Sequence, residues 1–182
     1  MTTPFLAPHE AQDQAVFRAL LRAMSRPGQG YRLAPSGEAA LKAIGQALLD
    51  LETRFYTPDP GLRARLSQLG ARAVGPGEAD YLFFTELGEP AWADLEQAPI
   101  GSLLHPEEGA TVVALSGPAP EAVLRLAGPG LPAPTLFESG LPARFWALRN
   151  QRVRFPLGWD VLLLEASGLC RAVPRSTLVE VT

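Results

Sequence analysis

The sequence predicts an α/β protein in which helices are layered on a mixed β-sheet. Segments with helical periodicity alternate along the chain with short strand-like segments, several of which are unbroken apolar runs. Such runs are typical of strands covered on both faces. The 182 residues are 47% hydrophobic and 19% charged, a composition that supplies a buried core rather than disorder. We therefore expect residues 1–182 to form a single domain.

Two amphipathic helices are predicted near the N-terminus. The first runs from about Glu10 to Ser25, with apolar residues at i, i+3, i+4 and i+7, and it stops at the Pro-Gly pair after Arg26. A short extended segment is expected at 31–33. Ser36 is then expected to cap a second helix, on which Lys42 faces away from the buried side. The predicted buried stripe of this helix is Leu41, Ile44, Leu48 and Leu51.

The middle of the chain predicts a sheet with an antiparallel meander. The expected elements are a strand at 52–56, a helix at 62–69, a strand at 81–84 and a short helix at 92–96. Residues 110–115 are expected to form a central strand. Within residues 121–127, Ala122, Leu124 and Leu126 alternate with Val123 and Arg125, so we expect this segment to pair with that strand in the antiparallel direction.

The last third of the chain predicts an aromatic helix followed by a buried hairpin. A proline-rich loop at 128–134 precedes a helix at 142–150. The apolar runs 161–164 and 169–173 then flank a tight connection at 166–168. We expect these two runs to pair as a hairpin that is covered on both faces.

Charged residues at the ends of that hairpin are the candidate anion-binding residues. Asp160 enters the first strand and Arg175 leaves the second, and the arginine fork suits a carboxylate, a phosphate or a phosphonate. The alternative is a structural ion pair that closes the hairpin. Arg26 is the third candidate, and its alternative is a helix C-terminal arginine that complements the helix dipole. No catalytic residue is assigned.

Composition argues against several classes of function. A net charge of −3 and a pI near 5.4 provide no general attraction to nucleic acid. Cys170 is the only cysteine, so an internal disulfide or an iron–sulfur site within one chain is excluded, and its apolar strand favours a buried thiol. Pyridoxal phosphate chemistry would have to use Lys42, the only lysine.

Motifs for metals, nucleotides and secretion are also missing. Two histidines do not make a histidine-rich metal site, and the glutamates after His105 are interpreted as solvated loop residues. No dinucleotide fingerprint, Walker loop or serine-nucleophile motif is present. Met1–Phe5 does not resemble the start of a signal peptide, and no run approaches the roughly 18 apolar residues of a membrane span. We expect a cytoplasmic protein with neither metal nor cofactor.

Five groups of short motifs, in order along nearly the whole chain, resemble the PhnH family of bacterial phosphonate metabolism. They are Phe17-Arg18-Ala19-Leu20 with Met24-Ser25-Arg26-Pro27-Gly28; Leu48-Leu49-Asp50-Leu51-Glu52-Thr53 with Phe55; His105-Pro106-Glu107-Glu108-Gly109-Ala110-Thr111; Gly128-Pro129-Gly130; and Phe155-Pro156-Leu157-Gly158-Trp159-Asp160 with Pro174-Arg175-Ser176-Thr177. Two mild departures are Trp159, where a small branched residue is commoner, and Ser176, where threonine is.

The resemblance implies a fold similar to the pyridoxal-phosphate-dependent aminotransferases, without the cofactor site. It implies a homodimer that assembles with subunits G, I and J of the carbon–phosphorus lyase core complex. With an ATPase-like partner, that complex attaches an alkylphosphonate to the ribose C1 of ATP and releases adenine; a separate radical iron–sulfur subunit breaks the carbon–phosphorus bond. The family brings no established catalytic residues to this chain.

Three hypotheses of function follow. The first is a structural or co-catalytic subunit of that complex, with residues 131–137 and 145–146 as candidates for an exposed apolar docking patch and a core position as the alternative. The second is an enzyme in its own right, with Arg26, Asp160 and Arg175 holding a triphosphate or phosphonate. The third is a small-ligand sensor on a degenerate aminotransferase-like fold.

Overall fold

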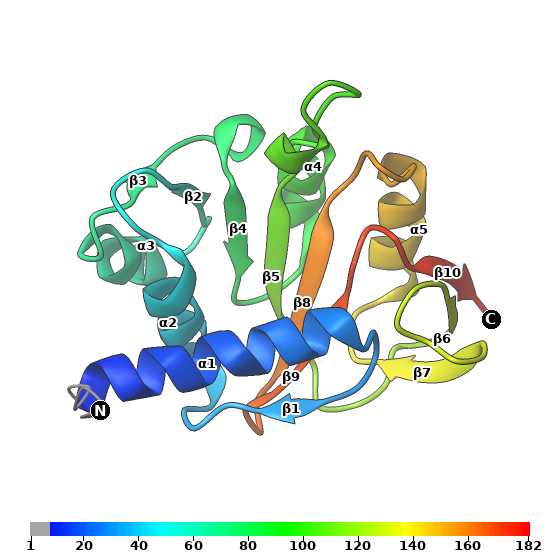
Figure 1. The fold of residues 1–182 in the computed structure, drawn as a ribbon. Coiled ribbons are helices and arrows are strands. Elements are labelled where there is room, and N and C mark those ends of the chain that lie inside the picture. The colour runs from blue at the N-terminus through cyan, green and yellow to red at the C-terminus, as the bar shows by residue number, and fades with distance from the viewer. Residues whose placement is uncertain (1–7) are drawn as a thin grey trace, which may run out of the picture.

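Helix starts in this protein coincide with prolines and capping residues. The computed structural model describes residues 8–182 (Figure 1). Asp59 accepts a hydrogen bond from the main-chain N–H of Leu62 and Pro60 occupies the first turn, which together fix the start of the third helix. The α-helices are α1 (Pro8–Ser25), α2 (Gly37–Leu48), α3 (Pro60–Ser67), α4 (Glu89–Gln97) and α5 (Ala143–Arg152), with short 3-10 turns η1 (Pro76–Glu78) and η2 (Pro106–Glu108). All five predicted α-helices are confirmed, with small shifts at their ends.

A seven-stranded mixed sheet forms the centre of the molecule. In spatial order its strands are β1 (Tyr31–Arg32), β9 (Leu169–Val173), β8 (Asp160–Glu165), β5 (Thr111–Ser116), β4 (Tyr81–Phe84), β2 (Arg54–Tyr56) and β3 (Arg72–Ala73). The five strands from β8 to β3 are parallel, whereas β9 is antiparallel to β8. The strand expected to be central, β5, is the middle one. The mixed α/β architecture is confirmed.

The predicted buried hairpin is confirmed as β8 and β9. Val161 lies opposite Val173, and the main-chain N–H of Gly168 donates to the carbonyl of Glu165 to close the turn. Gly168 has a φ of +82°, a left-handed conformation that glycine adopts without strain. On its other side β8 pairs with β5, so the hairpin is continuous with the centre of the sheet.

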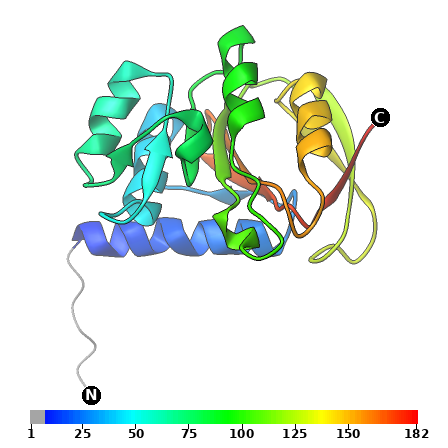
Figure 2. The same cartoon turned by 90° about the horizontal axis from the view of Figure 1, so that it is seen from above.

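Alternate residues of the central strands feed two separate hydrophobic cores. Phe83 and Val113 point to one face of the sheet, while their neighbours Leu82, Phe84 and Val112 point to the other. The first face is covered by α1, α2 and α3, and the second by α4, α5 and a smaller sheet. Figure 2 shows α1 on one side of the large sheet and α4 and α5 on the other. Both faces of the central strands are therefore buried from solvent.

The expected antiparallel meander at the centre is wrong. Residues of β6 (Ala122–Ala127) do not pair with β5, because β4 and β8 occupy both edges of that strand. Instead β6 is the middle strand of a three-stranded antiparallel sheet, between β7 (Thr135–Ser139) and β10 (Leu178–Val181). Its alternation has a different meaning: Leu124 and Leu126 are buried, while Val123 and Arg125 face outward. Neither β7 nor β10 was predicted.

Two smaller expectations also need correction, and the alternative left open for two aromatic residues is decided in favour of the core. Ser36 precedes α2 but its side chain makes no capping hydrogen bond. Leu51 is not in the buried stripe: α2 ends at Leu48, the chain becomes extended, and Leu51 is 84% exposed. Phe145 and Trp146 are completely buried among other aromatic rings, so they cannot form a docking patch. The N-terminal segment Met1–Phe5 lies outside the described residues.

Candidate functional site

Asp160 and Arg175, two of the predicted anion-site residues, lie in direct contact. Asp160 is the first residue of β8, and Arg175 follows the end of β9. The main-chain N–H of Arg175 donates to Oδ1 of Asp160 at 2.7 Å, and Nε and Nη2 donate to Oδ2 at 3.1 and 2.8 Å. The two side chains are only 14% and 17% exposed. Charge-assisted, two-pronged contacts of this kind fix the geometry of both groups.

Arg175 also ties a distant loop to the hairpin. Its Nη1 donates to the carbonyl of Pro106 at 2.7 Å and its Nη2 to the carbonyl of Gly109 at 3.0 Å. A side chain at Gly109 would overlap this guanidinium group and the carbonyl of Gly158, so the close approach requires glycine. Every guanidinium nitrogen of Arg175 thus has a protein acceptor, which is the geometry of a structural ion pair.

The third predicted residue, Arg26, lies in a different part of the surface. It follows the last turn of α1 and lines a groove of about 420 Å³ beside Gly130, Leu131 and Phe137. The cavity lined by Arg175 is formed by other residues. The structure therefore brings Asp160 and Arg175 together and places Arg26 in a separate groove.

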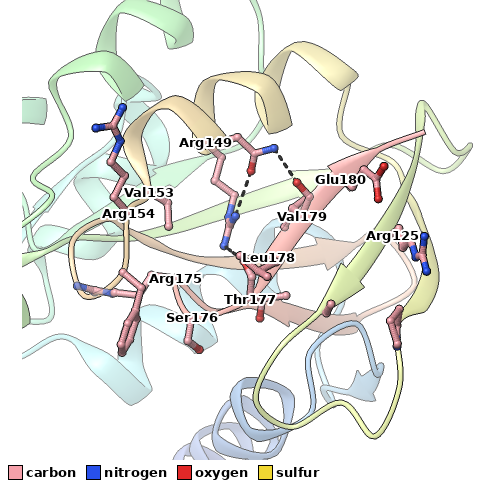
Figure 3. A pocket seen from close by; sticks show the side chains of 14 residues that line it. Arg125, Arg149, Val153, Arg154, Arg175, Ser176, Thr177, Leu178, Val179 and Glu180 are labelled. Carbon is pink, nitrogen blue, oxygen red and sulfur yellow. Dashed lines mark hydrogen bonds between the residues drawn. The ribbon is translucent and has the colours of Figure 1, made fainter.

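Arg175 lines one end of a cavity of about 500 Å³ between α5, β6 and β10, here named the α5–β10 cavity (Figure 3). Four arginines and a single acidic residue line it, namely Arg125, Arg149, Arg154, Arg175 and Glu180. Arg154 and Arg175 lie toward one end, Arg125 and Glu180 toward the other, and Arg149 lies between them (Figure 3). Arg175 is paired with Asp160, but the other three arginines outnumber Glu180, so the lining is cationic although the chain as a whole carries a charge of −3.

Arg149 is the central residue of this cavity. It is 1% exposed, and its Nη2 donates to the carbonyls of Pro174 at 2.7 Å and Thr177 at 3.1 Å. Its Nη1 makes a long contact of 3.4 Å to the side chain of Asn150, and its buried Nε has no hydrogen-bond partner in the described part of the chain. Burial lowers the pKa of this guanidinium to about 10, an effect that the more distant charge of Asp160 only partly offsets.

The sequence contains a signal that marks Arg149. Arg149 lies three residues after Trp146 and four after Phe145, which places it on the buried face of α5. A charged residue on the apolar face of a helix is unusual enough to mark a candidate site. Arg125 and Arg154 carry no comparable signal, because both are exposed and lie outside helices.

A second cavity lies where α/β folds usually bind ligands, at the carboxyl ends of the parallel strands. It measures about 380 Å³ and is lined by Ser116 at the end of β5 and by residues after β4 and before α5. Its charged lining residues are Glu86 and Glu121, so it does not attract anions. Lys42, in the middle of α2, is not among its lining residues.

The described residues contain neither a group of side chains that could hold a metal ion nor a helix that could span a membrane. Between residues 8 and 182, no three His, Cys, Asp or Glu side chains are grouped so that they could hold a metal ion. No described helix has the length and apolar character needed to cross a membrane. Cys170 is buried in β9, and burial raises the pKa of its thiol to about 12.

Comparison with known proteins assigns the family. Residues 5–180 match the family described as "Bacterial phosphonate metabolism protein (PhnH)". The chain belongs to the PhnH family. It is also 33% identical over 177 residues to a protein of Stutzerimonas stutzeri named "Putative C-P lyase subunit protein HtxG", and this similarity covers 91% of the chain and 85% of the relative. The family resemblance found in the sequence is thus confirmed, and it places this PhnH-family chain in phosphonate metabolism.

Proposed function

We propose that this chain is a subunit of a carbon–phosphorus lyase core complex, in which it is a structural or co-catalytic component. The proposal rests above all on the family match, which spans residues 5–180. The name of the S. stutzeri relative, a putative C-P lyase subunit, supports it. The proposed partners are subunits G, I and J and a second copy of the same chain.

The proposed reaction of the complex joins an alkylphosphonate to the ribose of ATP. A phosphonate oxygen forms a bond to C1 of the ribose, the bond from C1 to adenine breaks, and adenine leaves with a proton. The products are ribose 1-alkylphosphonate 5-triphosphate and adenine. We take a co-catalytic role for this chain to consist of holding one of the anionic groups. Its one thiol, Cys170, is buried and does not serve as a nucleophile.

A relationship to the pyridoxal-phosphate-dependent aminotransferases, without their cofactor, is part of the same proposal. The mixed sheet with helices on both faces is compatible with it. A Schiff base would need Lys42, the only lysine. That residue lies on α2 and does not line the cavity at the carboxyl ends of the strands.

The decisive experiment is co-expression with the remaining subunits, followed by affinity purification and an assay of adenine release from ATP with methylphosphonate. We expect the chain to co-purify, its omission to abolish adenine release, and addition of the purified chain to restore it. Adenine release at an unchanged rate without the chain would overturn the proposal.

A ligand sensor is a second candidate, because one chain alone forms the α5–β10 cavity with a buried arginine that pairs with no carboxylate of residues 8–182. The same experiment separates the two candidates. A sensor would bind a ligand as an isolated protein and would be dispensable for adenine release.

A further inference from the structure

We propose that the α5–β10 cavity is a binding site for a tetrahedral oxyanion, a phosphonate or phosphate group, with Arg149 as its buried anchor and Arg154 as a contact at its rim. The existence of the site is argued from the contacts of Arg149. Its assignment to the phosphonate or the triphosphate of the proposed reaction rests on the proposed function.

The buried charge of Arg149 has no counter-charge among the described residues. Arg175, also largely buried, has the carboxylate of Asp160 at 2.8 Å. Arg149 is more deeply buried and forms no ion pair within the described part of the chain; its only good acceptors are two main-chain carbonyls. A buried charge without a counter-charge is costly, so an anion in the cavity would stabilise the folded protein.

Two polar groups at the wall of the cavity lack hydrogen-bond partners among the described residues. The Nε of Arg149 and the Oγ1 of Thr177 are both buried and have no hydrogen-bond partner between residues 8 and 182. Thr177 is 2% exposed and lies on the loop whose carbonyl also contacts Arg149. Buried polar groups are usually satisfied, so an anion that reached these two groups would supply the partner they lack. Arg152 Nε, Trp159 Nε1 and Arg171 Nε are also buried and unsatisfied but do not line the cavity, so the site rests mainly on the uncompensated charge of Arg149.

The side chains that line the cavity carry a net positive charge. Arg125, Arg149 and Arg154 line the cavity without an ion-pair partner among the described residues, Arg175 is paired with Asp160, and Glu180 is the acidic residue in the lining. Cations gathered in a cleft focus their field and attract anions. The planar fork of arginine matches the oxygens of phosphate and phosphonate groups. A volume of about 500 Å³ admits a single phosphonate or a longer phosphate chain.

The structural alternative is that Arg149 only clamps the loop between β9 and β10. This role would use Nη2, which holds the carbonyls of Pro174 and Thr177, and it needs nothing from Arg154. Arg154 therefore separates the two interpretations. Its side chain is exposed, so its substitution leaves the fold intact, whereas changes at Arg149 threaten folding.

The test is calorimetric titration of the isolated full-length chain with methylphosphonate, inorganic phosphate and tripolyphosphate at low ionic strength. We expect saturable one-site binding of at least one of them. Arg154→Gln should weaken it roughly tenfold, since a hydrogen bond to a charged group is lost. The matched control is Arg63→Gln, an exposed arginine on α3 that forms no ion pair among the described residues. It should bind like the wild type.

The three probes distinguish the source of the anion. Preference for methylphosphonate identifies a site for the phosphonate substrate, and preference for tripolyphosphate identifies a site for the triphosphate. No saturable binding of any probe, or equal affinity in the wild type and in Arg154→Gln, would overturn the site. Adenine release by the reconstituted complex is measured separately. If adenine release requires the chain but the chain binds no anion, only the proposed site is wrong. If the chain binds an anion but adenine release does not require the chain, only the proposed function is wrong.

Discussion

Two arginines near the end of the β8–β9 hairpin are held in opposite ways. Arg175 donates to a carboxylate and two carbonyls, and no guanidinium nitrogen is left without an acceptor. Arg149 contacts neutral acceptors and leaves Nε unsatisfied. The first arrangement contributes stability, whereas the second retains capacity for a ligand. Both arginines line the same cavity, so a structural and a binding role are adjacent in this molecule.

Removing Asp160 should destabilise the protein far more than removing an exposed carboxylate. Asp160→Ala leaves the charge of Arg175 largely buried without its partner, and we expect a loss of about 3 kcal/mol in the free energy of unfolding. The matched control is Glu38→Ala, which breaks the ion pair to Arg65 where the glutamate is 57% exposed; its loss should stay below about 1 kcal/mol. Urea denaturation measures both, and equal losses would contradict a structural role for the buried pair.

The candidate site was only partly predictable at this scale. Asp160 and Arg175 could be paired from the sequence because a hairpin brings its two ends together. Arg26 was chosen from its local Pro-Gly context, which says nothing of what lies across the surface from it. Arg149 acquires its surroundings from β10 and from the loop at 174–177, and no local pattern shows contacts between segments so far apart in sequence.

At the scale of elements, the strongly apolar strands were predictable and the amphipathic ones were not. The run 161–164 has side chains for two cores and fits only a strand that is covered on both faces. The alternating pattern of β6 indicates that one face of this strand is exposed to solvent, but it does not specify the strand with which β6 pairs. Closing β5 with β4 and β8 forced β6 into a second sheet, where β10 joins it from the far end of the chain.

A side chain at Gly168 should destabilise the turn of the β8–β9 hairpin. A Cβ there would lie 2.9 Å from the carbonyl oxygen of Pro35 and 3.2 Å from that of Leu33, in addition to the strain of a φ of +82°. Gly37 is the matched control: its φ is +58°, but nothing lies within 4 Å of the added atom. We expect Gly37→Ala to cost about 1 kcal/mol from strain alone and Gly168→Ala at least about 1 kcal/mol more.

Thermal or urea unfolding of the two variants measures this difference. Equal losses in the free energy of unfolding for the two variants would mean that the loop at 33–35 moves aside without destabilising the protein, and that this loop does not hold the turn. The hydrogen bond from the main-chain N–H of Leu33 to the carbonyl of Gly168, at 2.8 Å, argues that the loop stays in place.

At the scale of the whole molecule, one sheet joins two cores. Consecutive residues such as Leu162 and Leu163 belong to opposite cores, so neither core can lose its sheet face without disturbing the other. The tryptophans, Trp92, Trp146 and Trp159, all lie in the core beneath α4 and α5. Cys170 lies in the core beneath α1 and α2. Each core thus carries a natural probe of its own.

The two cores should unfold in one cooperative transition. We expect the loss of native tryptophan fluorescence and the exposure of Cys170 to a thiol reagent to follow the same urea curve at pH 8, because both depend on the shared sheet. In the folded state, burial raises the pKa of the Cys170 thiol to about 12, which keeps it protonated and unreactive. In the unfolded chain its pKa returns to an ordinary value near 9, so labelling at pH 8 reports unfolding.

Brief pulses of the reagent after equilibration in urea give the fraction of accessible thiol at each concentration. Labelling that rises at lower urea than the fluorescence change would show that α1 and α2 detach before the second core unfolds, and the chain would then hold two units of separate stability. The Gly168→Ala variant provides an internal check, since it perturbs the hairpin whose strands contribute to both cores. In a single cooperative unit it must shift the two curves by the same amount.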